Sequence, residues 1–178
     1  MTTKNFKIVG AQSNIEWTGK KVTGSHNGTI SITAGTLLLN DDKLSGGNFI
    51  IDTASIKVLD ITDPATNAQF AGHLFSEDFF SVERYPEASF IITNTEQVNG
   101  DRYKIDGDLA IKGITRPASF EADLHVNEDV ATASGKIVID RTKYDIKFRS
   151  GNFFQNLGDT LIYNDFDLNV NLTAVFTH

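Results

Sequence analysis

The chain has 178 residues, the length of a single domain that can bury roughly 70% of the surface of its unfolded form. Its net charge of −7 comes from 16 basic and 23 acidic residues, and the basic residues stand singly, which argues against nucleic acid or an anionic lipid surface as a partner. Because cysteine is absent, disulfides, thiol chemistry and cysteine metal sites are excluded.

The first ten residues, MTTKNFKIVG, lack the apolar core of a secretion signal. No run in the chain approaches the roughly 18 apolar residues of a membrane-spanning helix. The sequence therefore predicts a protein without stable membrane insertion. As written it is expected in the cytoplasm, with the periplasm as the alternative if a signal peptide has been removed.

Helical spacing is confined to one segment, between about residues 65 and 80. Phe75, Phe79 and Phe80 recur at that spacing, and Ser76, followed by two acidic residues, resembles a helix N-cap. We expect a short helical insertion that brings several rings to one end of an apolar structure.

Alternation of apolar and polar residues predicts strands through most of the remaining chain. Asn99-Gly100 favours a type I′ hairpin, because that turn needs positive φ at both central residues, and it should join the strand of Phe90 to that of Ile105. The apolar positions of the later strands include Leu109 and Ile111, Phe120 to Val126, Ile137 and Ile139, Tyr144 to Phe148, and Phe166 to Leu172.

These hairpin-linked strands predict an all-β chain in which residues 1–178 form a single domain. A sandwich and a barrel fit the alternation equally, but a closed antiparallel β-barrel of about eight strands removes the exposed edges that a sandwich keeps. Such a barrel is either filled by side chains or hollow enough for one small ligand, and thirteen phenylalanines suit both cases.

Catalytic patterns are scarce. The sequence contains no zinc-binding helix motif, nucleophile elbow or phosphate-binding glycine loop, and the paired carboxylates sit next to each other in predicted loops, where they commonly solvate a turn. We predict no catalytic residue and no metal site. The histidines are far apart in the sequence: His26, His73, His125 and His178.

A second aromatic group lies beside fixed charge near the C-terminus. Arg141 could secure a tight turn with Asp140 or contact the headgroup of a ligand, and both interpretations stay open. The group consists of Phe148, Phe153, Phe154 and Leu157, with Arg149 and Asp159 nearby.

Two motifs carry a resemblance to a known family. HLFSEDFFSVERYP, residues 73–86, and GDLAIKGITRPASF, residues 107–120, resemble the two most recognisable motifs of the YceI-like family, in the same order. DTASIKVLD and IDRTKY are also similar to that family, so the resemblance covers most of the chain. The chain departs from the family pattern at Ser81, where Asp is usual, and at Ala110, where Thr is usual.

The resemblance implies an extended, lipocalin-like barrel whose apolar interior holds a polyisoprenoid or another long-chain amphiphile. In that case the helical insertion near residues 65–80 would cap one mouth, and no cofactor is expected beyond a bound isoprenoid or fatty-acid-like ligand. The predicted ligand-binding residues are Phe75, Phe79, Phe80, Phe90, Ile92, Leu109, Ile111, Phe120, Phe148, Phe153, Phe154 and Leu157, with Arg141 as a candidate headgroup contact.

Three functions remain open at this point. A lipid-binding or carrier barrel explains both the rings and the lack of catalytic motifs, and a filled barrel acting as a structural or interaction domain is the alternative. A lipid-modifying enzyme would need a carboxylate or histidine inside the apolar interior, with Asp140 or Asp159 as the first candidates. The sequence is compatible with a monomer or a homodimer.

Overall fold

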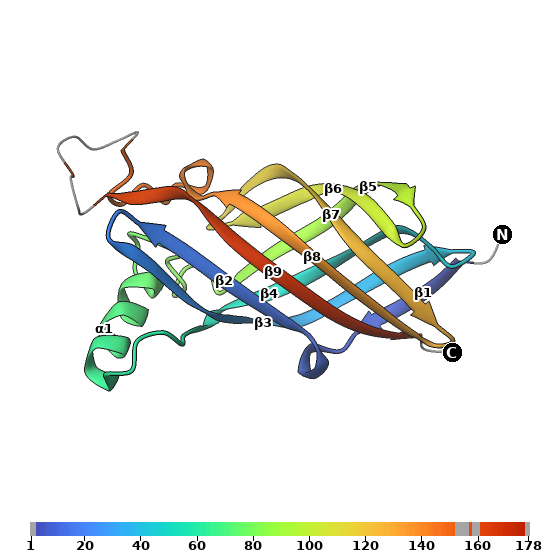
Figure 1. Cartoon of the computed structure of the whole chain (residues 1–178), viewed down its shortest axis with the longest axis horizontal. Coiled ribbons are helices and arrows are strands. Elements are labelled where there is room, and N and C mark those ends of the chain that lie inside the picture. The colour runs from blue at the N-terminus through green and yellow to red at the C-terminus, as the bar shows by residue number, and fades with distance from the viewer. Residues whose placement is uncertain (1–2, 152–156, 158–160, 177–178) are drawn as a thin grey trace.

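The computed structural model describes residues 3–151, 157 and 161–176. Its strands wind around a common axis, and one α-helix lies at the end of the molecule opposite the termini (Figure 1). The elements are β1 (Thr3–Ile8), η1 (Gly10–Gln12), β2 (Asn14–Lys21), β3 (Gly24–Asn40), β4 (Lys43–Val58), α1 (Pro64–Phe75), β5 (Glu87–Asn99), β6 (Arg102–Ile111), β7 (Ile114–Asn127), β8 (Val130–Asp140), η2 (Arg141–Tyr144) and β9 (Ile162–Phe176).

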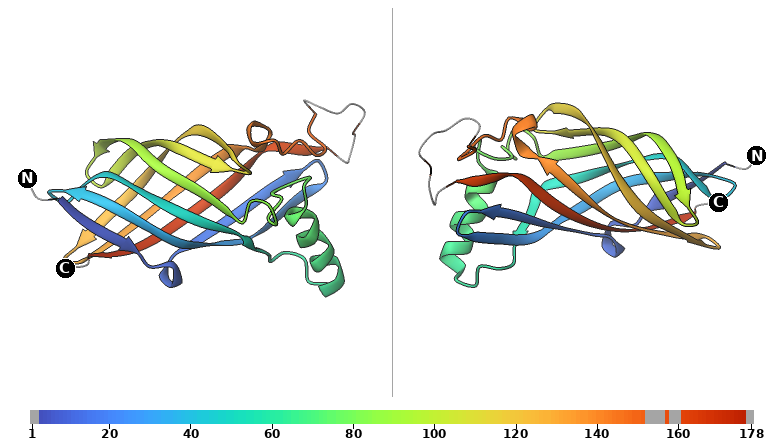
Figure 2. Two further views of the ribbon diagram at one scale, coloured as in Figure 1. Left: turned by 180° about the vertical axis from the view of Figure 1, so that it is seen from behind. Right: turned by 45° about the horizontal axis from the view of Figure 1, so that its top comes forward.

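The sheet closes on itself. The strands pair antiparallel in the order β1-β3-β2-β9-β8-β7-β6-β5-β4, and a further pairing of β3 with β4 completes the ring. β1 and β2 share one place between β3 and β9, with β2 beside residues 24–30 of β3 and β1 beside residues 36–40. The ring therefore has eight strand positions, which confirms the predicted all-β, lipocalin-like barrel. Figure 2 shows its elongated shape.

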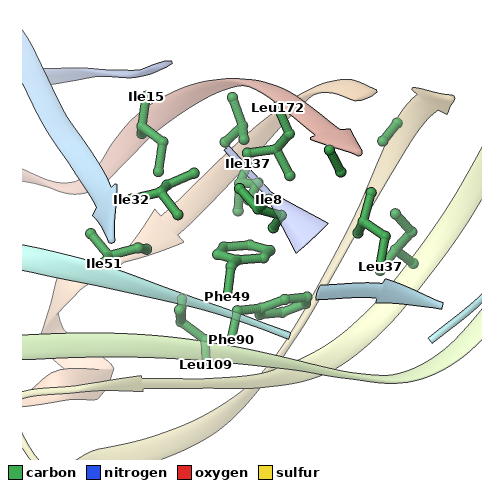
Figure 3. Packing of buried hydrophobic residues seen from close by; sticks show 14 of the residues in the cluster. Ile8, Ile15, Ile32, Leu37, Phe49, Ile51, Phe90, Leu109, Ile137 and Leu172 are labelled. Atoms are coloured by element: carbon green, nitrogen blue, oxygen red, sulfur yellow. The ribbon is translucent and has the colours of Figure 1, made fainter. Parts of the chain in front are cut away.

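Period-two alternation sets what fills the barrel. Along β6, Tyr103, Ile105 and Leu109 are buried, whereas Lys104 and Asp108 between them are exposed. Side chains on alternate positions of a strand point to opposite faces, so the apolar set of every strand meets inside the ring. Figure 3 shows isoleucine, leucine and phenylalanine side chains from several strands packed together there.

The hairpin between β5 and β6 forms where the sequence predicts it, but with a different turn. Asn99 pairs with Arg102 as the last strand residues, so the two loop residues are Gly100 and Asp101. Of these two, Gly100 alone has a positive φ, of 37°. The type I′ assignment on Asn99-Gly100 is therefore wrong, because Asn99 still belongs to the ladder.

The helix begins at Pro64, next to the predicted residue 65, but the predicted N-cap at Ser76 is wrong. Asp63 is the N-cap, Pro64 follows it, and Ser76 closes the last turn by donating its N–H to the carbonyl of His73. Proline suits the first helical turn because its φ is fixed and its missing N–H would have had no helical partner. Phe79 and Phe80 consequently lie in the turns after α1. None of the helices in the described part of the chain is long and apolar enough to cross a membrane.

We expect Asp63→Ala to loosen α1 in a way that Asp63→Asn does not. Asp63 accepts hydrogen bonds from the backbone N–H and the hydroxyl of Thr66, and these bonds lower the pKa of its carboxyl. A lowered folded-state pKa stabilises the cap above the ordinary carboxyl pKa, and this contribution is lost as the pH falls through the folded-state value. Hydrogen exchange of α1 amides at neutral pH should be severalfold faster in Asp63→Ala.

The asparagine variant provides the control for this prediction, because Asn is as good an N-cap as Asp but does not titrate. Its α1 exchange should stay near the wild-type rate and lose the acid dependence attributable to this cap. Equal protection of α1 in wild type and Asp63→Ala would contradict the assignment of Asp63 as the cap.

The predicted strand from Tyr144 to Phe148 is absent. Asp140 accepts a hydrogen bond from the N–H of Thr142, and the following residues form η2, which ends at Asp145 with a φ of 61°. Local side-chain hydrogen bonds of this kind compete with the strand ladder for the backbone. Tyr144 is nevertheless buried. The alternation of apolar and polar residues therefore indicated its burial correctly but not its secondary structure.

Candidate ligand-binding cavity

A cavity of about 290 Å³ occupies the barrel interior at the end that carries α1. Strand residues such as Ile51, Leu109 and Ile139 form its walls, and Leu74, Phe79 and Phe80 come from α1 and the turns after it. The lining side chains are largely apolar. A concave apolar space with a few polar groups is the common form of a small-molecule site.

The helix is held over this end by a small apolar cluster of its own. Leu74 packs with Ile56 and Val58 of β4, and Phe70 and Phe75 pack against that cluster. The side-chain amide of Asn67 donates to the carbonyls of Val58, at 2.8 Å, and of Ile61, at 3.0 Å. α1 is therefore fastened to β4 on one side of the cavity.

Three rings meet at the cavity wall beside α1. The imidazole of His73 lies 5.0 Å from the ring of Phe79 and 4.6 Å from that of Phe148, and the two phenyl rings are 5.7 Å apart. All three contacts are edge-to-face, a favoured arrangement of aromatic pairs. His73 Nε2 also lies 3.1 Å from a carboxylate oxygen of Asp78, which orients the imidazole.

A second histidine lines the cavity from β3. His26 Nδ1 lies 2.8 Å from a carboxylate oxygen of Asp60, and its ring is 4.6 Å from that of Phe70. Burial by itself would raise the pKa of Asp60, but the hydrogen bonds from His26 and from the N–H of Asn27 outweigh it and lower that pKa. The pair thus connects β3 to the segment that leads into α1.

The side of the cavity near the start of β9 carries positive charge. Arg141 is buried and donates from Nε to the carbonyl of Tyr163, and from its terminal nitrogens to the carbonyls of Ile146 and Ile162, at 2.9–3.0 Å. Burial lowers the pKa of Arg141, and the nearby Asp140 carboxylate opposes that shift. A guanidinium ordinarily titrates above about pH 12, so Arg141 remains charged at neutral pH.

Lys21 and Arg149 add positive charge beside Ile162, at the start of β9. Lys21 pairs with Ile162 in the β2–β9 ladder, and the carbonyl of Arg149 accepts the N–H of Ile162. Both side chains line the cavity together with Arg141, and the carboxylate of Asp165 lies among them. Although the chain as a whole is acidic, this side of the cavity is cationic.

The two sequence motifs at residues 73–86 and 107–120 meet at this end of the barrel. Lys112 donates from Nζ to the carbonyls of Glu77, at 2.6 Å, and Asp145, at 3.0 Å. A Cβ on Gly113 would come within 2.8 Å of the Tyr85 ring, so glycine allows the β6–β7 turn to approach that ring closely. The motifs therefore build the covered end of the barrel.

A family model, the YceI-like domain, matches residues 6–174. The chain belongs to the YceI-like family. It is 31% identical over 118 residues to a UPF0312 protein of Photorhabdus laumondii, a match that covers 66% of this chain and 58% of that protein. It is 31% identical over 111 residues to YceI of Escherichia coli O157:H7, covering 62% and 53% respectively. The matched part is thus little more than half the length of these relatives.

Solved structures share the YceI-like fold at low sequence identity. BcnA of Burkholderia cenocepacia superposes with a TM-score of 0.77 at 19% identity, covering 94% of this chain and 99% of that one. A polyisoprenoid binding domain from Saccharophagus degradans, implicated in plant cell wall breakdown, gives a TM-score of 0.71 at 11% identity, covering 97% and 98%. At these sequence identities the likeness shows a shared fold and no more.

The YceI-like barrel brings about half of the predicted ligand-binding residues to the main cavity. Phe75 is half-buried in the α1 cluster and lies outside the cavity lining, as does Leu157. Phe153, Phe154 and Asp159 lie outside the described residues. The predicted residues that line the cavity are Phe79, Phe80, Leu109, Ile111, Phe148 and Arg141.

The remaining three predicted residues lie deeper in the YceI-like barrel. Phe90 is 1% exposed and lines neither cavity, whereas Ile92 and Phe120 line a second cavity of about 40 Å³. The predicted ligand-binding residues therefore do not line one continuous cavity, because the interior is divided.

Sequence reasoning missed lining residues from the N-terminal strands and from α1. Trp17 of β2 and His26 of β3 line the cavity because those strands close the ring against β9 and β4, a pairing that alternation does not reveal. Phe70, four residues before Leu74, has helical spacing and could have been found by extending the apolar face of the predicted helix toward its N-terminus. Among the described residues, no three His, Asp or Glu side chains are grouped to hold a metal ion.

Proposed function

We propose that this protein binds a long-chain amphiphile of the polyisoprenoid class, with the chain inside the barrel beneath α1. The observation that carries the proposal is the apolar cavity of about 290 Å³. Each buried CH₂ contributes about 0.8 kcal/mol, so an extended hydrocarbon gains far more there than one hydrogen bond supplies. The solved polyisoprenoid binding domain with the same fold supports this choice of ligand class.

The polar end of the ligand is proposed to lie near Arg141. Its bonds to three backbone carbonyls use three of the five N–H donors of a guanidinium, so each terminal nitrogen keeps a second hydrogen. Lys21 and Arg149 add positive charge on the same side of the cavity. A headgroup that accepts hydrogen bonds, such as a phosphate or a carbonyl, suits this arrangement.

A filled barrel that acts as an interaction domain is the alternative. It is favoured by the half of the barrel nearest the termini, where Phe6, Leu39 and Ala174 are fully buried and pack in the main core cluster. A lipid-modifying enzyme has less support. Asp140, one of its two first candidates, accepts from Thr142 and does not line the cavity, and the two histidines that do line it, His26 and His73, are paired with Asp60 and Asp78.

Native mass spectrometry of protein purified without detergent tests the proposal, followed by organic extraction of whatever is released. The proposal expects one long-chain lipid per chain, and a melting temperature that rises when prenols are added, because a ligand that binds only the folded state stabilises it. A clean apo mass, with a melting temperature unchanged by every prenol tried, would overturn it in favour of the interaction domain. The same spectra report whether the protein is a monomer or a dimer.

A further inference from the structure

The barrel interior is divided into two chambers with no lining residue in common. The upper chamber is the cavity beneath α1, of about 290 Å³. The lower chamber, of about 40 Å³, lies toward the end that carries the termini and is lined by residues such as Leu37, Leu44 and Leu172. A partition of packed side chains must therefore separate them.

The partition is bracketed by lining residues on five strands. On β4, β8 and β9 the boundary falls between lining residues two positions apart, and on β5 and β6 it falls between lining residues four positions apart. The pairs, upper residue first, are Ile51 and Phe49 on β4, Ala88 and Ile92 on either side of Phe90 on β5, Leu109 and Ile105 on either side of Gly107 on β6, Ile139 and Ile137 on β8, and Leu168 and Val170 on β9.

Phe90 forms the centre of this partition. Its ring lies 5.3 Å from that of Phe49 and 5.4 Å from that of Phe120, so three rings from β4, β5 and β7 are in contact. Figure 3 shows Phe49 and Phe90 together, between Ile51 and Leu37. At 1% exposure the Phe90 ring is enclosed on all sides.

Gly107 leaves the space that the Phe90 ring occupies. A Cβ on Gly107 would lie 2.4 Å from Cζ of Phe90, well inside contact distance, so any larger residue would displace the ring. Gly107 is the inward position of β6 between Ile105 and Leu109. The ring therefore lies over a position of the neighbouring strand β6 that has no side chain of its own.

We propose that Phe90 is the floor of the ligand cavity and sets the longest hydrocarbon chain that the protein accepts. This inference rests on the proposed function, since it concerns the chain that would occupy the upper chamber. A chain that reaches the Phe90 ring can extend further only by displacing a closely packed side chain, which costs packing contacts. Affinity should therefore rise with chain length until the chain meets the floor and then stop rising.

Phe90→Leu tests the floor because leucine keeps the site apolar but cannot span the gap over Gly107. Dissociation constants are measured for geraniol, farnesol, geranylgeraniol and solanesol, in wild type and variant. We expect wild type to bind one prenol length most tightly. The variant should bind the next longer prenol about tenfold more tightly than wild type does, because burial of two further methylenes would give a gain of this size.

Phe6→Leu is the matched control. Phe6 is also fully buried, at 0% exposure, but its ring contacts that of Phe176 and not the rings that lie between the two chambers. The Phe6→Leu variant loses the same ring without joining the chambers, so the prenol length that it binds most tightly should equal that of wild type. A folded Phe90→Leu with the wild-type preference, or a wild type whose affinity keeps rising through solanesol, would overturn the floor while leaving the proposed function intact. If neither protein binds any prenol, the proposed function fails as well.

Discussion

Replacing Phe79 and Phe80 together by alanine is expected to weaken binding of a long-chain ligand by about a hundredfold and to leave the barrel folded. Both rings are half-buried and line the cavity, so each offers a face to the ligand in addition to its packing in the protein. The unfolding free energy should fall by about 2–3 kcal/mol, less than for two fully buried rings, because part of each ring is already outside the core. Isothermal titration and urea unfolding measure the two effects separately.

Phe75→Ala is the control for these two rings. Phe75 packs in the same cluster beside α1 but lies outside the cavity lining, so its loss should lower stability and change ligand affinity by less than about threefold. If the double variant does not fold, the two rings are core residues. If Phe75→Ala weakens binding as much as the double variant, the rings act by holding α1 and not by contacting the ligand.

Replacing Arg141 by methionine is expected to lower the unfolding free energy by about 3 kcal/mol, because three carbonyls, one of them buried and two partly buried, would lose their donor. Recovery of the cost of burying the charge offsets part of this loss. Arg141→Lys should be only a partial rescue, since an ammonium cannot reproduce the planar guanidinium geometry that reaches both Ile146 and the start of β9. Urea unfolding of the three proteins provides the comparison.

Arg149→Met is the control for Arg141→Met, because Arg149 also contributes charge to the proposed headgroup site but does not secure the fold. Arg149 lines the same side of the cavity, but it is exposed, and its guanidinium lies over the Phe148 ring at 4.9 Å. Its replacement should change stability by less than about 0.5 kcal/mol. If Arg141→Met keeps wild-type stability, its three hydrogen bonds do not secure the β8–β9 connection, and the prediction is wrong.

The fold follows from the sequence because alternation is a local property. The pattern around Phe120 or Leu168 shows which side chains face inward, and the short turns between such runs make each strand the neighbour of the next. Closure is different, since β2 pairs with β9 from the other end of the chain, and no local signal encodes that partner. The lining residues Trp17 and His26 were missed for this reason.

The site is only partly predictable because alternation gives the face of a residue but not its height along the barrel. Phe90 and Leu109 are direct partners across β5 and β6, yet Leu109 lines the upper chamber and Phe90 closes it. The difference comes from the neighbouring Gly107, which lets the ring lie over β6, and a single-strand pattern does not contain that contact. The two roles considered for Arg141 likewise depended on partners twenty residues away, around Ile162.

The ends of β1 and β9 lie at the opposite end of the barrel from α1 (Figure 1). Anything joined to the chain at either terminus, whether an affinity tag or a neighbouring domain, is therefore attached at the end away from the cavity. A protein immobilised on a sensor surface through a terminal tag would present the α1 end to the solution. Ligand exchange could then be followed on the intact barrel without obstruction from the support.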